Sequence, residues 1–254
     1  MSLYAYGKTF FAYQQIGSLA SARSVVPIVM RHFQPASILD VGCGAGAWVA
    51  AYRECGACDV IGVDADYLRE EQLLFDPRRF HALDVSGTFR LGRQFDIAQC
   101  LEVAEHITPS ASQSLVDNLV AHAPVVVFSA APPGQGGDHH VNERPYEFWR
   151  DLFDARGYQL FDFLRPRIRF NARIEPWYRY NMLVFVRDDA IQLLSAEVAA
   201  TRVEATAPVP ELSPIGWRIR RRVLSALPPF VVTRMASAKH RMALRSRRNS
   251  AGAS

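Results

Sequence analysis

Short apolar runs alternate with segments of helical periodicity along most of the chain. The runs predict five strands, at residues 38–41, 59–64, 79–85, 95–101 and 124–131. The segments around them predict helices over residues 18–33, 45–55, 112–123 and 145–158, the first kinked or divided at Pro27. Strands that alternate with helices are typical of a parallel sheet covered by helices on both faces.

The pattern changes after residue 158. The runs YQLFDFLRPRI and YNMLVFVRD are both strand-like, and no helix is predicted between them. We interpret them as an antiparallel pair at the edge of the sheet. A helix is predicted over residues 190–205. The chain then divides into an N-terminal arm and helix (1–35), a core domain (36–190), a helix with a Pro-rich linker (191–214) and a basic amphipathic tail (215–254).

The composition is that of a globular protein, with 49% hydrophobic and 21% charged residues among 254. The four cysteines are irregularly spaced, as expected of reduced thiols. The N-terminus lacks the basic and apolar regions of a signal peptide, and no apolar run approaches the ~18 residues of a membrane span. These features predict a cytoplasmic protein.

A glycine-rich turn follows the first predicted strand, in the segment ILDVGCGAGAW (38–48). Glycines at residues 42, 44 and 46 let the backbone approach a ligand, and the next helix presents free N–H groups to it. The turn also fits the dinucleotide pattern, so a nicotinamide cofactor is an alternative. However, Asp40 lies two residues before the turn, where its carboxylate would repel a pyrophosphate and would suit an ammonium group.

Carboxylates also follow the next two predicted strands. Asp64 ends the second strand, where it can accept hydrogen bonds from both hydroxyls of a ribose. Asp84 follows the third strand and is placed to receive the amino group of an adenine. Three carboxylates along one edge of a sheet suit an adenosyl ligand without phosphates.

The motifs ILDVGCGAGAW, VIGVDAD, LDV and FDIAQCLEVAEHI resemble the successive motifs of class I S-adenosylmethionine-dependent methyltransferases, over about residues 36–190. The resemblance implies a Rossmann-like, seven-stranded α/β sheet whose last strand is antiparallel, and S-adenosylmethionine as cofactor. It places cofactor-binding residues as follows: Asp40, Gly42, Gly44 and Gly46 along the methionine portion, Asp64 and Ala65 at the ribose, Asp84 and Val85 at the adenine, and Leu101 beside the sulfonium.

The loop SAAPPGQGGDHHVNERPYEFW, after the fifth strand, holds the candidates for catalysis. We predict His140 as the general base, His139 as its alternative, and Glu143 and Asn142 to hold sugar hydroxyls or orient the imidazole. A loop that is merely solvated is the other interpretation. The same loop offers mixed metal ligands in Asp138, His139 and Glu143, but no metal is predicted because no second acidic cluster accompanies them.

The residues after the fourth strand, Glu102, Glu105 and His106, are interpreted as favouring a helix N-terminus and packing locally. The segments PGQGG, HVNE and RPRI, with WYRYNMLVFVR, are similar to a bacterial group of methyltransferases found with glycan and lipopolysaccharide assembly enzymes. That similarity implies O-methylation of a sugar hydroxyl in glycan or lipopolysaccharide biosynthesis, with a sugar or glycan as substrate.

Three alternatives stay open: methylation of another small molecule, methylation of RNA, and a silent module that binds S-adenosylmethionine. The RNA alternative lacks an Asn/Asp-Pro-Pro-aromatic motif after the fourth strand, and the acidic core disfavours a nucleic-acid footprint. The oligomeric state is not indicated.

Charge is unevenly distributed along the chain. Residues 211–254 carry ten Lys and Arg and one acid, a net of +9, so the overall +4 leaves −5 for the rest. An apolar stripe recurs every four residues, at Ile215, Ile219, Val223 and Leu227, among Arg218, Arg220, Arg221 and Arg222. The stripe favours a helix on an anionic membrane surface, against the alternatives of a helix packed on its own domain or a solvated tail.

Overall fold

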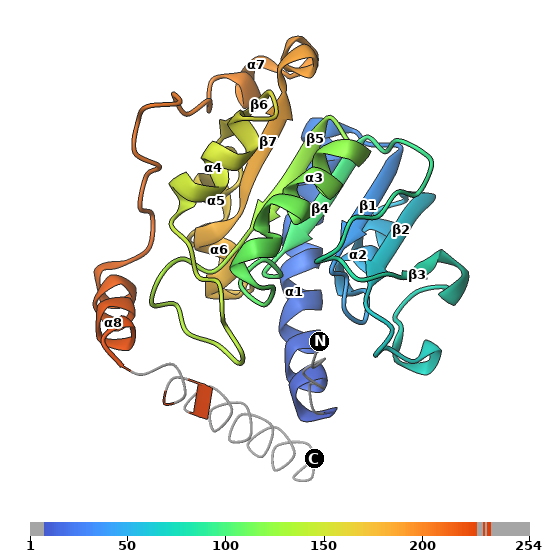
Figure 1. Ribbon diagram of the computed structural model, residues 1–254. Helices are drawn as coiled ribbons and strands as arrows, with labels where there is room; N and C mark the ends of the chain where they lie inside the picture. The colour runs from blue at the N-terminus through green and yellow to red at the C-terminus, as the bar shows by residue number, and fades with distance from the viewer. Residues whose placement is uncertain (1–7, 228–230, 232, 235–254) are drawn as a thin grey trace.

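The computed structural model describes residues 8–227, 231 and 233–234, and these form one seven-stranded sheet with helices on both faces (Figure 1). The strands are β1 (Ser37–Val41), β2 (Asp59–Asp64), β3 (Phe80–Ala82), β4 (Ile97–Leu101), β5 (Val125–Ser129), β6 (Tyr158–Phe161) and β7 (Leu183–Arg187). Their order across the sheet is β3-β2-β1-β4-β5-β7-β6. Strands β1 to β5 pair in parallel, and β7 is antiparallel to both β5 and β6. The predicted Rossmann-like fold class, with an antiparallel last strand, is confirmed.

The longer helices are α1 (Lys8–Phe33), α2 (Ala47–Glu54), α3 (Ser112–His122), α4 (Tyr146–Asp154) and α8 (Ile215–Ser225). Helices α3 and α4 pack on one face of the sheet, where Trp149 and Phe153 are almost fully buried. Helices α1 and α2 pack on the other face, through residues such as Val25 and Tyr52. Burying such side chains on both faces is the main stabilisation of a fold of this class.

Helix α1 continues through Pro27 instead of dividing there. Pro27 is exposed, whereas Val25, Val26 and Val29 are buried against the sheet and α2. Tertiary packing of this buried face therefore outweighs the loss of one backbone hydrogen bond at proline.

Two predictions about the last third of the chain are wrong. Two short helices, α5 (Arg165–Ile168) and α6 (Pro176–Asn181), lie between β6 and β7, where none was predicted. The helix predicted over residues 190–205 is replaced by a 3₁₀ turn, Asp188–Leu193, and the short α7 (Ala196–Ala199).

The backbone after α7 pairs with the edge of the sheet, which explains why a longer helix does not form. The amide of Asp162 donates to Thr201 O, and the amide of Val203 donates to Leu160 O. These bonds satisfy groups of the edge strand β6 that would otherwise have no partner.

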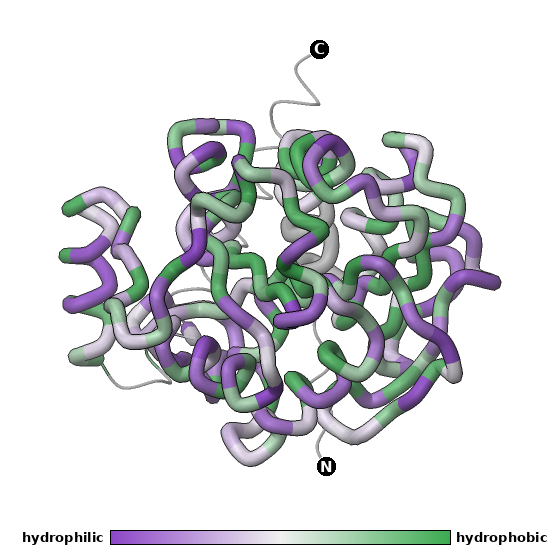
Figure 2. The backbone as a smooth tube through the Cα atoms, turned by 90° about the horizontal axis from the view of Figure 1, so that it is seen from above, coloured by the Kyte–Doolittle hydropathy of each residue, from purple (hydrophilic) through white to green (hydrophobic). Residues whose placement is uncertain are grey.

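Helix α8 stands at one side of the molecule, where its turns carry both hydrophobic and hydrophilic residues (Figures 1 and 2). It begins at Ile215, as predicted for the basic tail. The start of the N-terminal arm and most of the tail after Leu227 lie outside the described residues. Among the described helices, none combines the length and the apolar character that a membrane span requires.

Candidate active site

The strand order reverses between β1 and β4, which lie side by side at the centre of the sheet. In open α/β sheets, ligands bind in the crevice at the carboxyl ends of the strands flanking such a reversal. Asp40 lies near the end of β1, Asp64 ends β2 and Leu101 ends β4. The fold therefore brings these three predicted cofactor residues to one edge of the sheet.

The three predicted glycines of the turn all have positive φ, of 77°, 53° and 83° for Gly42, Gly44 and Gly46. Their surroundings differ, however. A Cβ at Gly42 would overlap the side chain of Val103, and a Cβ at Gly46 would overlap the ring of Phe75. Of the three, only Gly44 has no described atom within 4 Å of where a Cβ would stand. Gly44 is thus the position open to a ligand, and packing accounts for the other two.

Asp64 holds the glycine turn in place. Its Oδ2 accepts from the amide of Gly44 at 2.7 Å, and its Oδ1 accepts from the amide of Ala65 at 2.7 Å and from the hydroxyl of Tyr67 at 2.8 Å. Burial raises the pKa of this carboxyl, and the bonds from Gly44 and Tyr67 oppose the rise. Two carboxylate oxygens offer about four acceptor positions, so capacity for a ribose hydroxyl remains.

Asp40 is 2% exposed and only partly satisfied. Its Oδ1 accepts from Gln99 Nε2 at 3.2 Å, and Gln99 is held in turn by the hydroxyl of Tyr52. Its Oδ2 is buried with no hydrogen-bond partner among the described residues. Burial raises the pKa of Asp40 to about 7. An ammonium group would satisfy Oδ2, so the residue fits the predicted methionine portion of the cofactor.

The remaining cofactor positions are of two kinds. Asp84 is exposed, and its Oδ1 accepts from the amide and hydroxyl of Ser86. Val85 and Leu101 are 8% and 7% exposed and belong to the two hydrophobic clusters. Their side chains can therefore form apolar walls, while polar contacts at these positions would have to come from the backbone.

A buried polar network lies directly after β4, which sequence reasoning missed. Glu102 has a φ of 55° and its two carboxylate oxygens accept from Gln135 Nε2 at 2.8 Å and Asn181 Nδ2 at 3.1 Å. Asn181 also donates to Gln135 Oε1, and its own oxygen accepts from the hydroxyl of Tyr146. The network ties the segment after β4 to the loop after β5 (residues 130–145, the β5–α4 loop) and to α6.

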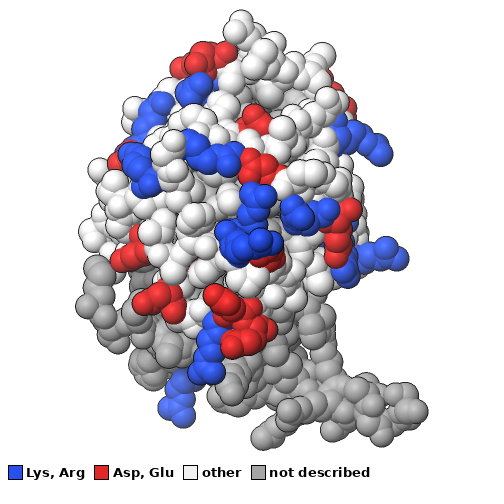
Figure 3. All heavy atoms as spheres, turned by 90° about the vertical axis from the view of Figure 1, so that its right-hand side faces the viewer, with Lys and Arg blue, Asp and Glu red and all other residues white. Residues whose placement is uncertain are grey.

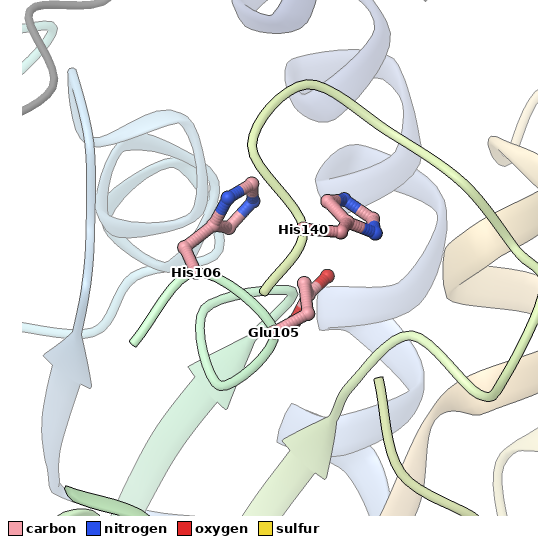
Figure 4. A group of neighbouring side chains, drawn as sticks. All are labelled: Glu105, His106 and His140. Atoms are coloured by element: carbon pink, nitrogen blue, oxygen red, sulfur yellow. The ribbon is translucent and has the colours of Figure 1, made fainter. Parts of the chain in front are cut away.

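Glu105 and His106 come from the segment after β4 and meet His140 of the β5–α4 loop (Figure 4). Burial, followed by the charge of Glu102, raises the pKa of Glu105 well above its ordinary value. Burial lowers the pKa of His106 to about 3, so this imidazole is neutral near pH 7. The interpretation of these two residues as local packing is incomplete, because they face a histidine from another loop.

The β5–α4 loop is organised around Glu143. Its Oε1 accepts from Nδ1 of His140 at 2.8 Å and from the amide of Gly136, and its Oε2 accepts from the amide of Gly134. Glu143 therefore orients the imidazole of His140, one of the two functions predicted for it. His139 has a φ of 57°.

Asn142 does not face an open site. It is 2% exposed, and its amide donates to Ala104 O and to the hydroxyl of Ser112. The predicted contact of Asn142 with a sugar hydroxyl is thus wrong, because the side chain anchors the loop. Together with buried Gln135 and Asp138, it also rules out the alternative of a merely solvated loop.

Helix α8 covers the β5–α4 loop. Arg220 donates to Gln135 O and Arg221 donates to Pro133 O, while the ring of Trp217 lies 6.0 Å from that of Tyr180 in α6. The predicted apolar stripe is on the other side, since Ile215, Ile219 and Val223 are 72%, 56% and 57% exposed. The helix thus packs through a face that sequence analysis did not single out.

The surface beside β3 has no large patch of side chains of one charge sign (Figure 3). Basic and acidic side chains adjoin one another there, with Arg79 and Arg93 paired to Asp59 and Arg78 paired to Asp76. Such a mixed surface does not provide the basic footprint that nucleic acid requires.

Comparison with known proteins agrees with this fold and site. Residues 13–165 match the model of a family described as a methyltransferase domain, which is more than half of the chain. The chain therefore belongs to this methyltransferase family, and S-adenosylmethionine is its cofactor. A search of curated proteins gives no match.

Several solved structures share the fold at low sequence identity. The sugar N-methyltransferase KedS8 from Streptoalloteichus is 21% identical, with a TM-score of 0.56 over 74% of this chain and 96% of that chain. The magnesium protoporphyrin IX methyltransferase ChlM from Synechocystis, with bound S-adenosylmethionine, is 19% identical, with a TM-score of 0.52 over 68% and 80%. The amino pentose methyltransferase CalS10 from Micromonospora echinaspora is 20% identical, with a TM-score of 0.50 over 74% and 99%.

Proposed function

We propose that this methyltransferase transfers the methyl group of S-adenosylmethionine to a hydroxyl group of a sugar, in glycan or lipopolysaccharide assembly. The observation that carries the proposal is the His140–Glu143 pair, which the β5–α4 loop holds beside the carboxyl end of β4. Two of the structural neighbours described above are sugar methyltransferases by name, which supports a sugar as substrate.

The cofactor would lie along the crevice between β1 and β4. Asp40 would accept from its ammonium group, Gly44 would let the backbone approach it, and Asp64 would accept from a ribose hydroxyl. Asp84 and Val85 would flank the adenine, and Leu101 would lie beside the sulfonium. The cofactor supplies a methyl group that is already electrophilic, so the protein needs to position and deprotonate the acceptor.

His140 is the proposed general base. Glu143 accepts from its Nδ1, which leaves Nε2 as the nitrogen that can take the proton of the acceptor hydroxyl. The carboxylate of Glu143 would then stabilise the imidazolium that forms. General base catalysis of this kind contributes typically about 10²–10⁴-fold to the rate.

The test uses full-length protein, S-adenosylmethionine with a labelled methyl group, and glycan from cells that lack the protein. His140→Ala should reduce labelled product by about a hundredfold or more while affinity for the cofactor stays the same. His139→Ala is the matched control and should keep most of the activity. Loss of activity in His139→Ala with an active His140→Ala would contradict the assignment.

The exposed side of α8 supports a further part of the proposal, attachment to an anionic membrane on its cytoplasmic face. Ile215, Ile219 and Val223 are more than half exposed, and Arg218 and Arg222 are exposed among them. Apolar side chains in the headgroup boundary and arginines on lipid phosphates are the contacts of an interfacial helix. Because the opposite side of α8 covers the β5–α4 loop, attachment would bring the site close to a lipid-linked sugar.

A further inference from the structure

Three side chains from two loops converge beside the carboxyl end of β4 (Figure 4). Glu105 and His106 lie on the segment that follows β4, and His140 lies on the β5–α4 loop. One carboxylate oxygen and two imidazole nitrogens, one from each residue, all lie within 4.8 Å of one another. Ligands of a Zn²⁺ ion stand about 2.0–2.2 Å from it, so small side-chain rotations would close the three atoms around an ion.

Glu105 is buried with one carboxylate oxygen that accepts no hydrogen bond from the described residues. The side chain is 1% exposed, and Oε2 has no hydrogen-bond partner among the described residues. Leaving a buried polar atom unsatisfied is unfavourable, and more so for a charged group. A cation beside Oε2 would remove that cost, and it would also offset the negative charge of neighbouring Glu102.

His140 is held as a metal-binding histidine is usually held. Its Nδ1 lies 2.8 Å from Oε1 of Glu143, which fixes the tautomer and leaves the lone pair of Nε2 available. Glu143 is itself fixed by the amides of Gly134 and Gly136. A carboxylate behind a ligating imidazole is the arrangement that orients the ring and raises its basicity toward a metal.

We propose that Glu105, His106 and His140 bind a divalent cation of the first transition row. Mixed imidazole and carboxylate ligands suit such ions, and three protein ligands leave coordination positions open for substrate. This site differs from the set weighed on sequence grounds, Asp138, His139 and Glu143. Of those, Glu143 supports the proposed site from behind His140.

The role of the cation rests on the proposed function. Two adjacent hydroxyls of the acceptor sugar would bind the ion through the open positions, and the ion would lower the pKa of the reacting hydroxyl. The O–H bond then breaks and its proton passes to water, while the oxygen electron pair forms the new bond to the methyl carbon. The S–CH₃ bond breaks with its electron pair left on sulfur, which gives S-adenosylhomocysteine. When a cation is bound, Nε2 of His140 is a ligand and the cation makes the hydroxyl reactive, so the general-base role proposed for His140 applies only to the protein without a bound cation.

The test is direct binding of Mn²⁺ to chelator-treated, full-length protein, followed by electron paramagnetic resonance and calorimetry. Mn²⁺ is preferred to Zn²⁺ as the probe because Cys55 and Cys58 are exposed thiols that would bind Zn²⁺ elsewhere. We expect saturable binding of a single ion per chain. Glu143→Gln should weaken it about 10–100-fold, as expected for a residue that orients a ligand, and His106→Gln should weaken it at least as much.

His81→Gln, at an exposed histidine on β3, is the matched control and should bind Mn²⁺ like the wild type. Unchanged affinity for S-adenosylmethionine in each variant shows that it is folded. Absence of saturable Mn²⁺ binding, or equal affinity in the wild type and His106→Gln, would overturn the site. Measuring turnover separates the two proposals. If the ion binds but no sugar is methylated, the metal site stands and the proposed function is wrong. If methylation continues at an unchanged rate in excess chelator, the proposed role of the ion is wrong.

Discussion

Replacing Asp64 by Asn tests the cofactor site with little change in volume. In the native protein one carboxylate oxygen accepts from the amide of Gly44, and the other accepts from Ala65 and Tyr67. An Asn side chain keeps one acceptor oxygen and puts an NH₂ group where the second oxygen was. Then either the amide of Gly44 loses its acceptor, or the amide of Ala65 and the hydroxyl of Tyr67 lose theirs.

The expected effect follows from hydrogen bonds to a charged group, which are worth about 1.5–3 kcal/mol each. Since about 1.4 kcal/mol is a factor of ten, Asp64→Asn should weaken S-adenosylmethionine binding roughly tenfold to a hundredfold. Isothermal calorimetry of the full-length protein measures this change. Asp66→Asn, at an exposed acid two residues away, is the matched control and should leave the affinity unchanged.

A comparison of ligands separates the ribose contact from the support of the glycine turn. Removing a ribose hydroxyl from S-adenosylhomocysteine should weaken its binding to the wild type. The same removal should weaken its binding to Asp64→Asn much less. Equal losses in both proteins, or an Asp64→Asn variant that is folded and binds the cofactor like the wild type, would refute the assignment.

Three further predictions concern stability and the surface. Burial raises the pKa of Asp40 from 3.8 to about 7, so the folded protein without cofactor binds this proton more tightly than the unfolded chain and loses stability as pH rises between these values. Asp40→Asn should remove that loss, which is about 3 kcal/mol between pH 5 and pH 7 at about 1.4 kcal/mol per pH unit, in urea unfolding at pH 5 and pH 8. Gly46→Ala should destabilise the fold by about 1–3 kcal/mol in urea unfolding, because its Cβ would overlap Phe75 at a φ of 83°. Replacing Ile219 and Val223 by Ser should abolish co-sedimentation with anionic liposomes at low salt while cofactor binding persists.

Controls for these predictions come from the same structure. Gly44→Ala has no steric overlap, so it should weaken cofactor binding more than it lowers stability. Leu193→Ser removes a side chain that is 81% exposed and lies outside α8, and it should leave liposome binding intact. A wild-type protein that ignores anionic liposomes would contradict membrane attachment.

The strands were predicted well from the sequence, and the predicted cofactor residues Asp40, Asp64 and Leu101 lie at one edge of the sheet, because both depend on short-range patterns. Asp40, the glycine turn and Asp64 lie within a strand–turn–helix–strand unit whose apolar period and spacing are visible along the chain. The 190–205 segment was predicted wrongly because its backbone pairs with β6, and that long-range pairing outweighs helical propensity.

The acceptor side of the site was harder to predict because its partners are far apart in sequence. Glu102 bonds to Asn181, 79 residues further along the chain, and no local pattern marks that contact. Glu105 and His106 were singled out for their position directly after the fourth strand, but no local pattern indicated that His140 would meet them. The packed face of α8 was also hard to predict. The four-residue apolar repeat pointed to Ile219, which is exposed, whereas Leu224 is buried and Trp217 contacts Tyr180 on the face that packs against the domain.

Analysis of surface glycans tests the proposed function most directly. Cells with and without the protein are grown with methionine carrying a labelled methyl group, and their glycans are compared by mass spectrometry and NMR. We predict a labelled methyl ether on a sugar oxygen that is lost without the protein and is restored by the wild type but not by His140→Ala. Identical glycans in the two strains, or a label found on a sugar nitrogen, would contradict it.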